Sequence, residues 1–166
     1  MSVKKIALCS ILIAFAIIIS LVEKLIPMDI VLPGLKLGLA NIVTLYAILK
    51  IGKKEAFVIF LIRVILSATI SGRISSLSFS FLGALFSYII MCILSRFVGK
   101  GISVIGLSIA GSAGHNTGQI IAGIILIGNT SILLYLPYLL IMSIPVGFLT
   151  GELITAFFKK TQKGLS

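Results

Sequence analysis

The chain has 166 residues, of which 59% are hydrophobic and 11% charged, and its mean hydropathy is +1.27. Soluble domains carry about 25% charged residues, so this composition excludes a soluble globular domain whose surface faces water. The length fits a single domain, 1–166, with no hydrophilic stretch long enough for a second one. We therefore expect an all-α integral membrane protein whose solvent is the lipid bilayer.

The net charge of +10 arises from 14 Lys and Arg against 4 acids. In a soluble protein this excess would suggest a nucleic acid partner. Here the basic residues form short clusters between apolar runs, which is typical of a membrane topology signal, so we expect no nucleic acid partner. Cys9 and Cys92 lie inside apolar runs and are interpreted as small buried hydrophobes rather than a disulfide or metal pair.

Six apolar runs approach the roughly 20 residues that a helix needs to cross the hydrocarbon core. They are 4–22, 37–52, 55–71, 77–97, 102–127 and 132–158. The first is interpreted as a retained helix rather than a cleaved signal peptide, because no small-x-small site precedes Glu23. The long connection 23–36 contains Pro27, Pro33 and Gly34, which predict an ordered or partly re-entrant loop instead of a helix.

The distribution of basic residues predicts the orientation of the six helices. With the N-terminus inside, the cytoplasmic segments hold ten of them: Lys4, Lys5, Lys50, Lys53, Lys54, Arg96, Lys100, Lys159, Lys160 and Lys163. The opposite side holds Lys24, Lys36 and Arg73, and Arg63 lies within the third run. The positive-inside rule then places both termini in the cytoplasm, and we expect a multi-pass protein of the bacterial plasma membrane.

The fifth run contains a cluster of polar side chains. Helical spacing of three or four residues places His115 with Gln119, and Asn116 with Gln119, on one face. Such side chains are costly against lipid, so they should face the bundle interior or a cavity. A substrate site and hydrogen bonding between helices are both open interpretations.

Three further positions are candidate binding residues. Arg63 needs a buried partner, which is either an anionic group of a substrate or Glu152 on the sixth run as a structural ion pair. Lys36 and Asn41 lie where the long connection enters the second helix, so a helix N-terminus and a lysine are available to an anion. Snorkelling of Lys36 and capping or packing by Asn41 are the alternatives.

The first run also carries small residues, Ala7, Ser10 and Ala14, at a spacing that permits close helix packing. They would serve either the internal bundle or an external membrane partner. The chain has no Walker A pattern, so it cannot power transport by nucleotide hydrolysis. Asp29 is its only aspartate, so the carboxylates that a magnesium-dependent prenyl diphosphate enzyme needs are missing. We expect no metal or cofactor and no enzymatic activity.

Two segments, PGLKLGLANIVTLYAI (33–48) and GSAGHNTGQIIAG (111–123), resemble those of the Gx transporter family, whose members are often labelled heptaprenyl diphosphate synthase component I. This family is in turn similar to the substrate-binding (S) components of energy-coupling factor (ECF) importers. The resemblance implies a six-helix, S-component-like bundle that binds a vitamin or similar small molecule near the outer face. It also implies a transmembrane coupling protein and two ATPase subunits as partners. S components usually have an alanine-x-x-x-alanine pair on their first helix, where this chain has Ser10 and Ala14.

We therefore expect the substrate-binding subunit of an importer, whose substrate is an anionic or carbonyl-rich small molecule. The expected pocket is lined by His115, Asn116, Gln119 and Asn41, with Lys36 and Arg63, and closed by loop 23–36. One alternative is an integral membrane enzyme or enzyme subunit of isoprenoid or quinone metabolism. The other is a scaffold or assembly factor without a ligand.

Overall fold

The computed structural model describes residues 3–23, 38–72 and 74–163, without the side chains of 71, 74–76 and 161–163. These residues form six α-helices and two short 3-10 helices, and they contain no strand. The helices in chain order are α1 (Val3–Glu23), α2 (Asn41–Lys50), α3 (Lys53–Ser71), α4 (Ile74–Leu94), η2 (Ser95–Phe97), α5 (Val104–Ile127), η3 (Thr130–Tyr135) and α6 (Leu136–Lys163). The all-helical prediction is confirmed, and each apolar run corresponds to one α-helix.

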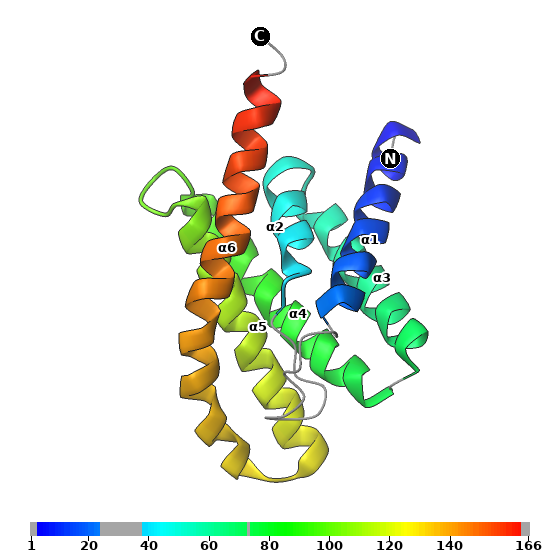
Figure 1. Ribbon diagram of the computed structural model, residues 1–166, viewed down its shortest axis with the longest axis vertical. Coiled ribbons are helices and arrows are strands. Elements are labelled where there is room, and N and C mark those ends of the chain that lie inside the picture. The colour runs from blue at the N-terminus through cyan, green and yellow to red at the C-terminus, as the bar shows by residue number, and fades with distance from the viewer. Residues whose placement is uncertain (1–2, 24–37, 73, 164–166) are drawn as a thin grey trace.

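The second helix departs most from its predicted bounds. The run 37–52 predicts a helix across the membrane, but α2 has 10 residues, which is about 15 Å of rise and half of the hydrocarbon thickness. Its start is preceded by Gly38 at a φ of +81°, a conformation that side chains rarely adopt. Gly52, at a φ of +148°, separates it from α3. The helix α2 therefore begins partway along the bundle (Figure 1), and its first residue, Asn41, is 7% exposed.

Three helical segments are long and apolar enough to cross a membrane: Val3–Glu23, Leu77–Phe97 and Thr130–Lys160. The helix α3 carries Lys53, Lys54, Glu55 and Arg63, and α5 contains the polar residues around His115, so both are less apolar. The three segments support a helical membrane protein. The count of six crossings and their orientation remain predictions.

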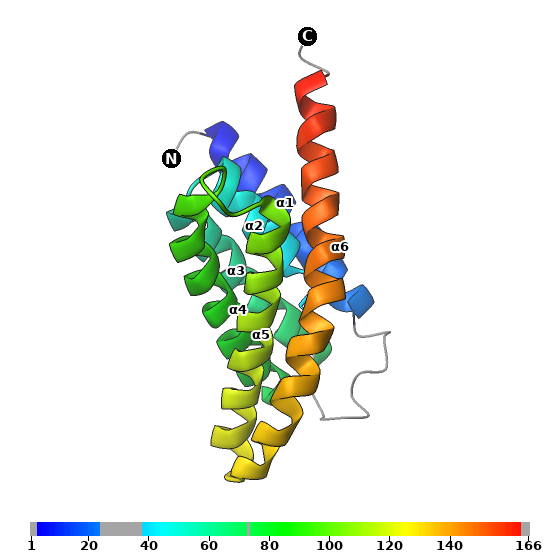
Figure 2. The same cartoon turned by 90° about the vertical axis from the view of Figure 1, so that its left-hand side faces the viewer.

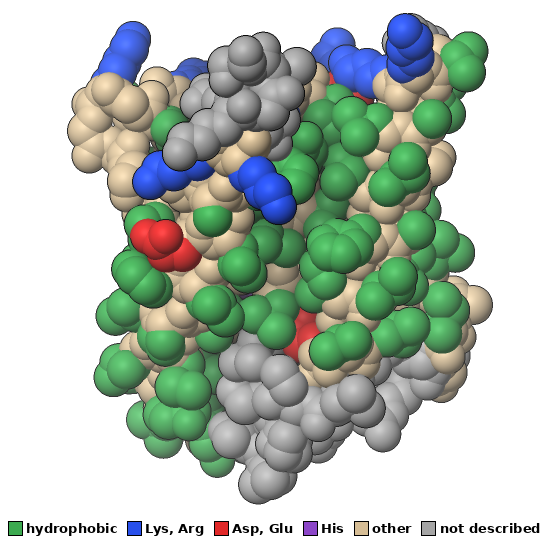
Figure 3. Space-filling model, turned by 45° about the horizontal axis from the view of Figure 1, so that its top comes forward, with side chains coloured by type: hydrophobic (Ala, Val, Ile, Leu, Met, Phe, Trp, Pro, Cys, Tyr) green, Lys and Arg blue, Asp and Glu red, His purple; other side chains and the backbone are tan. Residues whose placement is uncertain are grey.

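The basic residues gather at one end of the bundle. The start of α1, the α2–α3 turn, the α4–α5 connection and the end of α6 lie together at the top of Figure 1, and both termini are there too. Figure 3 shows Lys and Arg side chains at this end and hydrophobic side chains over the flanks below it. Exposed apolar flanks with a charged rim suit a lipid environment, and the grouping agrees with the predicted cytoplasmic set.

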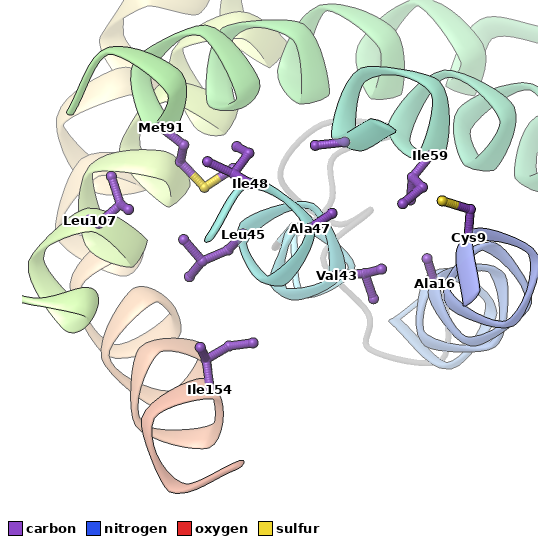
Figure 4. Close-up of a cluster of buried hydrophobic side chains, with 11 residues drawn as sticks. Cys9, Ala16, Val43, Leu45, Ala47, Ile48, Ile59, Met91, Leu107 and Ile154 are labelled. Atoms are coloured by element: carbon purple, nitrogen blue, oxygen red, sulfur yellow. The ribbon is translucent and has the colours of Figure 1, made fainter. Parts of the chain in front are cut away.

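The short helix α2 is the centre of the largest apolar cluster (Figure 4). Leu45 points toward the side of α4, α5 and α6, while Val43 and Ala47 point toward α1 and α3. The helix α5 packs closely against α4 and α6, as Figures 1 and 2 both show. A Cβ on Gly118 of α5 would lie 2.3 Å from the carbonyl oxygen of Leu82 in α4. Glycine at this position therefore permits the two backbones to meet.

Candidate functional site

The imidazole of His115 occupies a space between two glycines. A Cβ on Gly38, just before α2, would lie 2.8 Å from His115 Cδ2, and a Cβ on Gly83 of α4 would lie 2.8 Å from His115 Cε1. The ring therefore fits between the backbones of Gly38 and Gly83 because neither residue has a side chain. Any larger residue at either position would displace the ring. His115 is 2% exposed, so its position is determined by α2 and α4 as well as by its own helix.

Gln119 lies one turn after His115 and is held against the same ring. The Gln119 amide nitrogen is 2.9 Å from His115 Nε2. An amide nitrogen donates, so Nε2 accepts and the imidazole proton is on Nδ1. The predicted position of these two side chains on one face is confirmed.

Asn116 points elsewhere. Its Nδ2 donates to the backbone carbonyl of Leu139 in α6 across 2.7 Å. Adjacent residues on a helix differ in direction by about 100°, so Asn116 faces α6 while His115 faces α2 and α4. The sequence left two interpretations open for the polar cluster, a substrate site and hydrogen bonding between helices. In the described part of the chain, Asn116 makes a hydrogen bond between helices.

Arg63 and Asn41 are joined by a hydrogen bond inside the bundle. Arg63 Nη2 donates to Asn41 Oδ1 across 3.2 Å, and the two residues are 5% and 7% exposed. Arg63 Nε and Asn41 Nδ2 have no hydrogen-bond partner among the residues described. Asn41 Nδ2 also lies close to Gly38. The structure therefore brings together Arg63, Asn41 and His115 from three different helices.

The acid beside Arg63 is Glu23, which sequence reasoning missed. Glu23 is the last residue of α1, is 4% exposed, and is the acid whose charge acts on Arg63. Its Oε1 accepts hydrogen bonds from the backbone N–H of Gly38 and of Leu39, the latter at 3.3 Å. Glu152, which the sequence left open as a structural partner of Arg63, is exposed on α6, so of the two alternatives this one does not fit the structure. A clue in the sequence was that Glu23 directly follows an apolar run, at the depth where α1 ends.

Two small cavities meet at Gly38. Cavity A has polar lining from Ser20, Glu23, Arg63, Ser67, Ser80 and His115. Cavity B, on the other side, has polar lining from Asn41, Ser108, Ser112 and Thr150. Each offers about 10 Å³ to the centre of a water molecule, which is room for about one water. Chemically, this is a place for one or two hydrogen-bonding atoms in otherwise apolar surroundings.

The remaining predicted residues are Lys36 and the small residues of α1. Lys36 and the connection 24–37 lie outside the described residues. On α1, Ala7, Ser10 and Ala14 are all exposed, while Cys9 and Ala16 are buried against the bundle. Ser10 Oγ donates to the Ile6 carbonyl of its own helix. The small residues are therefore on the outward face of α1 and do not pack the internal bundle.

A comparison with protein families now bears on this site. Residues 12–157 match the family model described as heptaprenyl diphosphate synthase component I. The chain belongs to that family. It is the family, also called the Gx transporter family, that the two sequence motifs resemble. No curated protein and no solved structure matches the chain.

Membership of this family covers every residue of the cluster. Glu23, Asn41, Arg63 and His115 all lie within the matched range. The family name refers to a component of a synthase and gives none of these residues a role. The role of the cluster must therefore be inferred from its chemistry.

Proposed function

We propose that the chain is the membrane-embedded, substrate-binding subunit of an ECF-type importer for a small molecule resembling a vitamin or cofactor precursor. The observation that carries this proposal is the buried cluster of Arg63, Asn41 and His115 in an apolar bundle. Ionisable side chains within a membrane are costly and are typical of substrate and ion sites. Two donors in this cluster have no acceptor among the described residues, which favours a site that awaits a ligand over simple helix packing.

The second part of the proposal concerns energy and partners. The sequence has no nucleotide-binding motif, so ATP hydrolysis would come from two partner ATPases through a transmembrane coupling protein. The outward face of α1 supports this role, because Ala7, Ser10 and Ala14 are all exposed there at helical spacing. Small residues allow a partner helix to approach closely in lipid.

The alternative function is a subunit of an isoprenoid or quinone enzyme, which the name of the matching family favours. That activity would need carboxylates to hold magnesium and a diphosphate. Within the described residues, no group of three or more His, Cys, Asp or Glu could hold a metal ion. The importer proposal is therefore the better fit to the chemistry of the cluster.

The first experiment is to purify the full chain from its native membrane and identify co-purified small molecules by mass spectrometry. The importer proposal expects one stoichiometric small molecule in the wild type, reduced about ten-fold or more in Arg63→Gln, since loss of about 1.4 kcal/mol is ten-fold in affinity. Thr44→Val is the control, because Thr44 is buried in α2 but lines neither cavity. A prenyl diphosphate that binds only with magnesium would favour the synthase alternative.

The second experiment tests the partner. Ala14→Trp should prevent the chain from co-purifying with a coupling protein, because a large side chain would keep a partner helix away from this face of α1. Ile144→Trp is the matched control, since Ile144 is exposed on α6 and is already large. Equal recovery of the coupling protein with both variants would contradict the assignment of this face.

A further inference from the structure

The charges around cavity A cancel. Among its described lining residues it has one acid, Glu23, and one base, Arg63, both more than nine-tenths buried. The third titratable group, His115, has the Gln119 amide nitrogen 2.9 Å from its Nε2, where an amide nitrogen donates and the ring nitrogen accepts. The backbone N–H groups of Gly38 and Leu39 donate to the Glu23 carboxylate.

The unpartnered groups of the cluster are donors. Arg63 Nε carries an N–H, and an arginine has no acceptor atom. Asn41 already uses its oxygen to accept from Arg63, which leaves its Nδ2 to donate. A ligand atom that binds to Arg63 Nε and Asn41 Nδ2 must therefore be a hydrogen-bond acceptor.

These two features select the kind of ligand group. A carboxylate would satisfy the donors but would add a second negative charge near Glu23, in surroundings where an uncompensated charge is costly. A neutral carbonyl oxygen satisfies the donors and leaves the charges balanced. Arg63 lines cavity A and Asn41 lines cavity B, and each cavity has room for about one water, so one oxygen fits beside each donor.

We propose that the Arg63–Asn41 pair receives an uncharged carbonyl oxygen of the substrate, of the amide or ring-carbonyl class, and that Glu23 is the specificity-determining residue that excludes carboxylates. This inference rests on the proposed importer function and narrows its substrate class. Glu23 acts by its charge on the site and by holding Gly38, which lines both cavities.

The test uses acetamide and acetate as probes, because they have nearly the same shape and differ in charge. The chain has three arginines, Arg63, Arg73 and Arg96, so its Nε–H nuclear magnetic resonance signals are few. Loss of one signal in Arg63→Lys assigns Arg63. The purified full chain in detergent is titrated with each probe at pH 7 and constant ionic strength, and the shift of this signal is followed.

The expected result is a saturable shift with acetamide and binding of acetate that is weaker by about ten-fold or more. Glu23→Gln keeps an acceptor oxygen for Gly38 but removes the charge, so it should reverse the preference toward acetate. Asn41→Leu should weaken acetamide binding by on the order of ten-fold, whereas the matched Thr44→Val on the same helix should not.

Three outcomes would overturn the proposal: equal or tighter binding of acetate to the wild type, no saturable shift with either probe, or an acetamide response unchanged by Asn41→Leu. The comparison of acetamide and acetate binding to the wild type tests the proposal even if the Glu23→Gln variant does not fold. The importer function is judged separately. A co-purified anionic substrate would support the importer function and overturn the preference for an uncharged carbonyl. Absence of any bound molecule would count against the importer function, and the acetamide titration would still test the carbonyl site.

Discussion

The Arg63 guanidinium donates to the side-chain oxygen of Asn41 across 3.2 Å and so joins the middle of α3 to the first residue of α2. The contact exists because α2 is half the length of a crossing helix and begins inside the bundle. Its N-terminal residue is thereby brought to the depth of an arginine that lies well inside α3. The cluster is built where a helix ends within the membrane protein, which is where backbone and side-chain polar groups become available to a ligand.

The charge balance in this cluster predicts coupling between Arg63 and Glu23. Removing one member of a buried pair destabilises by about 3–5 kcal/mol, because the other charge is left uncompensated. Arg63→Gln and Glu23→Gln should each show such a loss, and the double variant should lose clearly less than their sum. The free energy of unfolding of the wild type, the two single variants and the double variant, measured in mixed micelles, gives this double-mutant cycle.

Glu152 provides the control for that cycle. It is exposed on α6, so Glu152→Gln should change the free energy of unfolding by no more than about 0.5 kcal/mol and should show no coupling to Arg63. Coupling to Glu152 instead of Glu23 would contradict the described arrangement.

The contact between α4 and α5 predicts a strong effect at one glycine. In Gly118→Ala the new methyl would meet the Leu82 carbonyl oxygen at 2.3 Å, so the helices must separate, at a cost of about 1–3 kcal/mol. Gly106→Ala in the same helix meets nothing closer than 3.4 Å and should be neutral or slightly stabilising. Thermal melting in detergent compares the two; equal melting temperatures would show that the helices are not so close.

Asn116 and Gln119 are predicted to respond differently to replacement by leucine. Asn116→Leu removes the hydrogen bond to Leu139 and should lower stability by about 0.6–2 kcal/mol, with ligand affinity per folded molecule unchanged. Gln119→Leu frees His115 Nε2 and should weaken ligand binding as well. The measurements are melting temperature and the amount of co-purified ligand. A loss of ligand in Asn116→Leu without loss of stability would restore the original prediction that Asn116 lines the pocket.

The orientation is tested by labelling single cysteines in a Cys9→Ala, Cys92→Ala background. Asn129 and Lys100 are exposed in the α5–η3 and α4–α5 connections, at opposite ends of α5. In intact cells a membrane-impermeant maleimide should modify an Asn129→Cys variant and not a Lys100→Cys variant. Modification in the opposite sense would place the basic end outside the cell.

The sequence by itself determined the helical class and the approximate bounds of each α-helix. In lipid every backbone group must be satisfied within its own segment, so an apolar run of about 20 residues predicts a helix without knowledge of its neighbours. The distribution of Lys and Arg likewise predicted which helix ends share one end of the bundle. The same reasoning identified His115, Asn41 and Arg63 as candidate site residues, because a polar side chain in an apolar run is costly unless it has a partner.

Only the tertiary structure decided which of these polar groups meet. Helical spacing gives direction around one axis but says nothing of depth or of the facing helix, so His115 and its neighbour Asn116 looked alike in sequence and yet face different helices. The shortness of α2 depends on Gly38, Glu23 and the packing of α1, which no local pattern encodes. For the same reason similar depth made Glu152 one of two open partners for Arg63, whereas the close approach of α1 and α3 brings Glu23 to it.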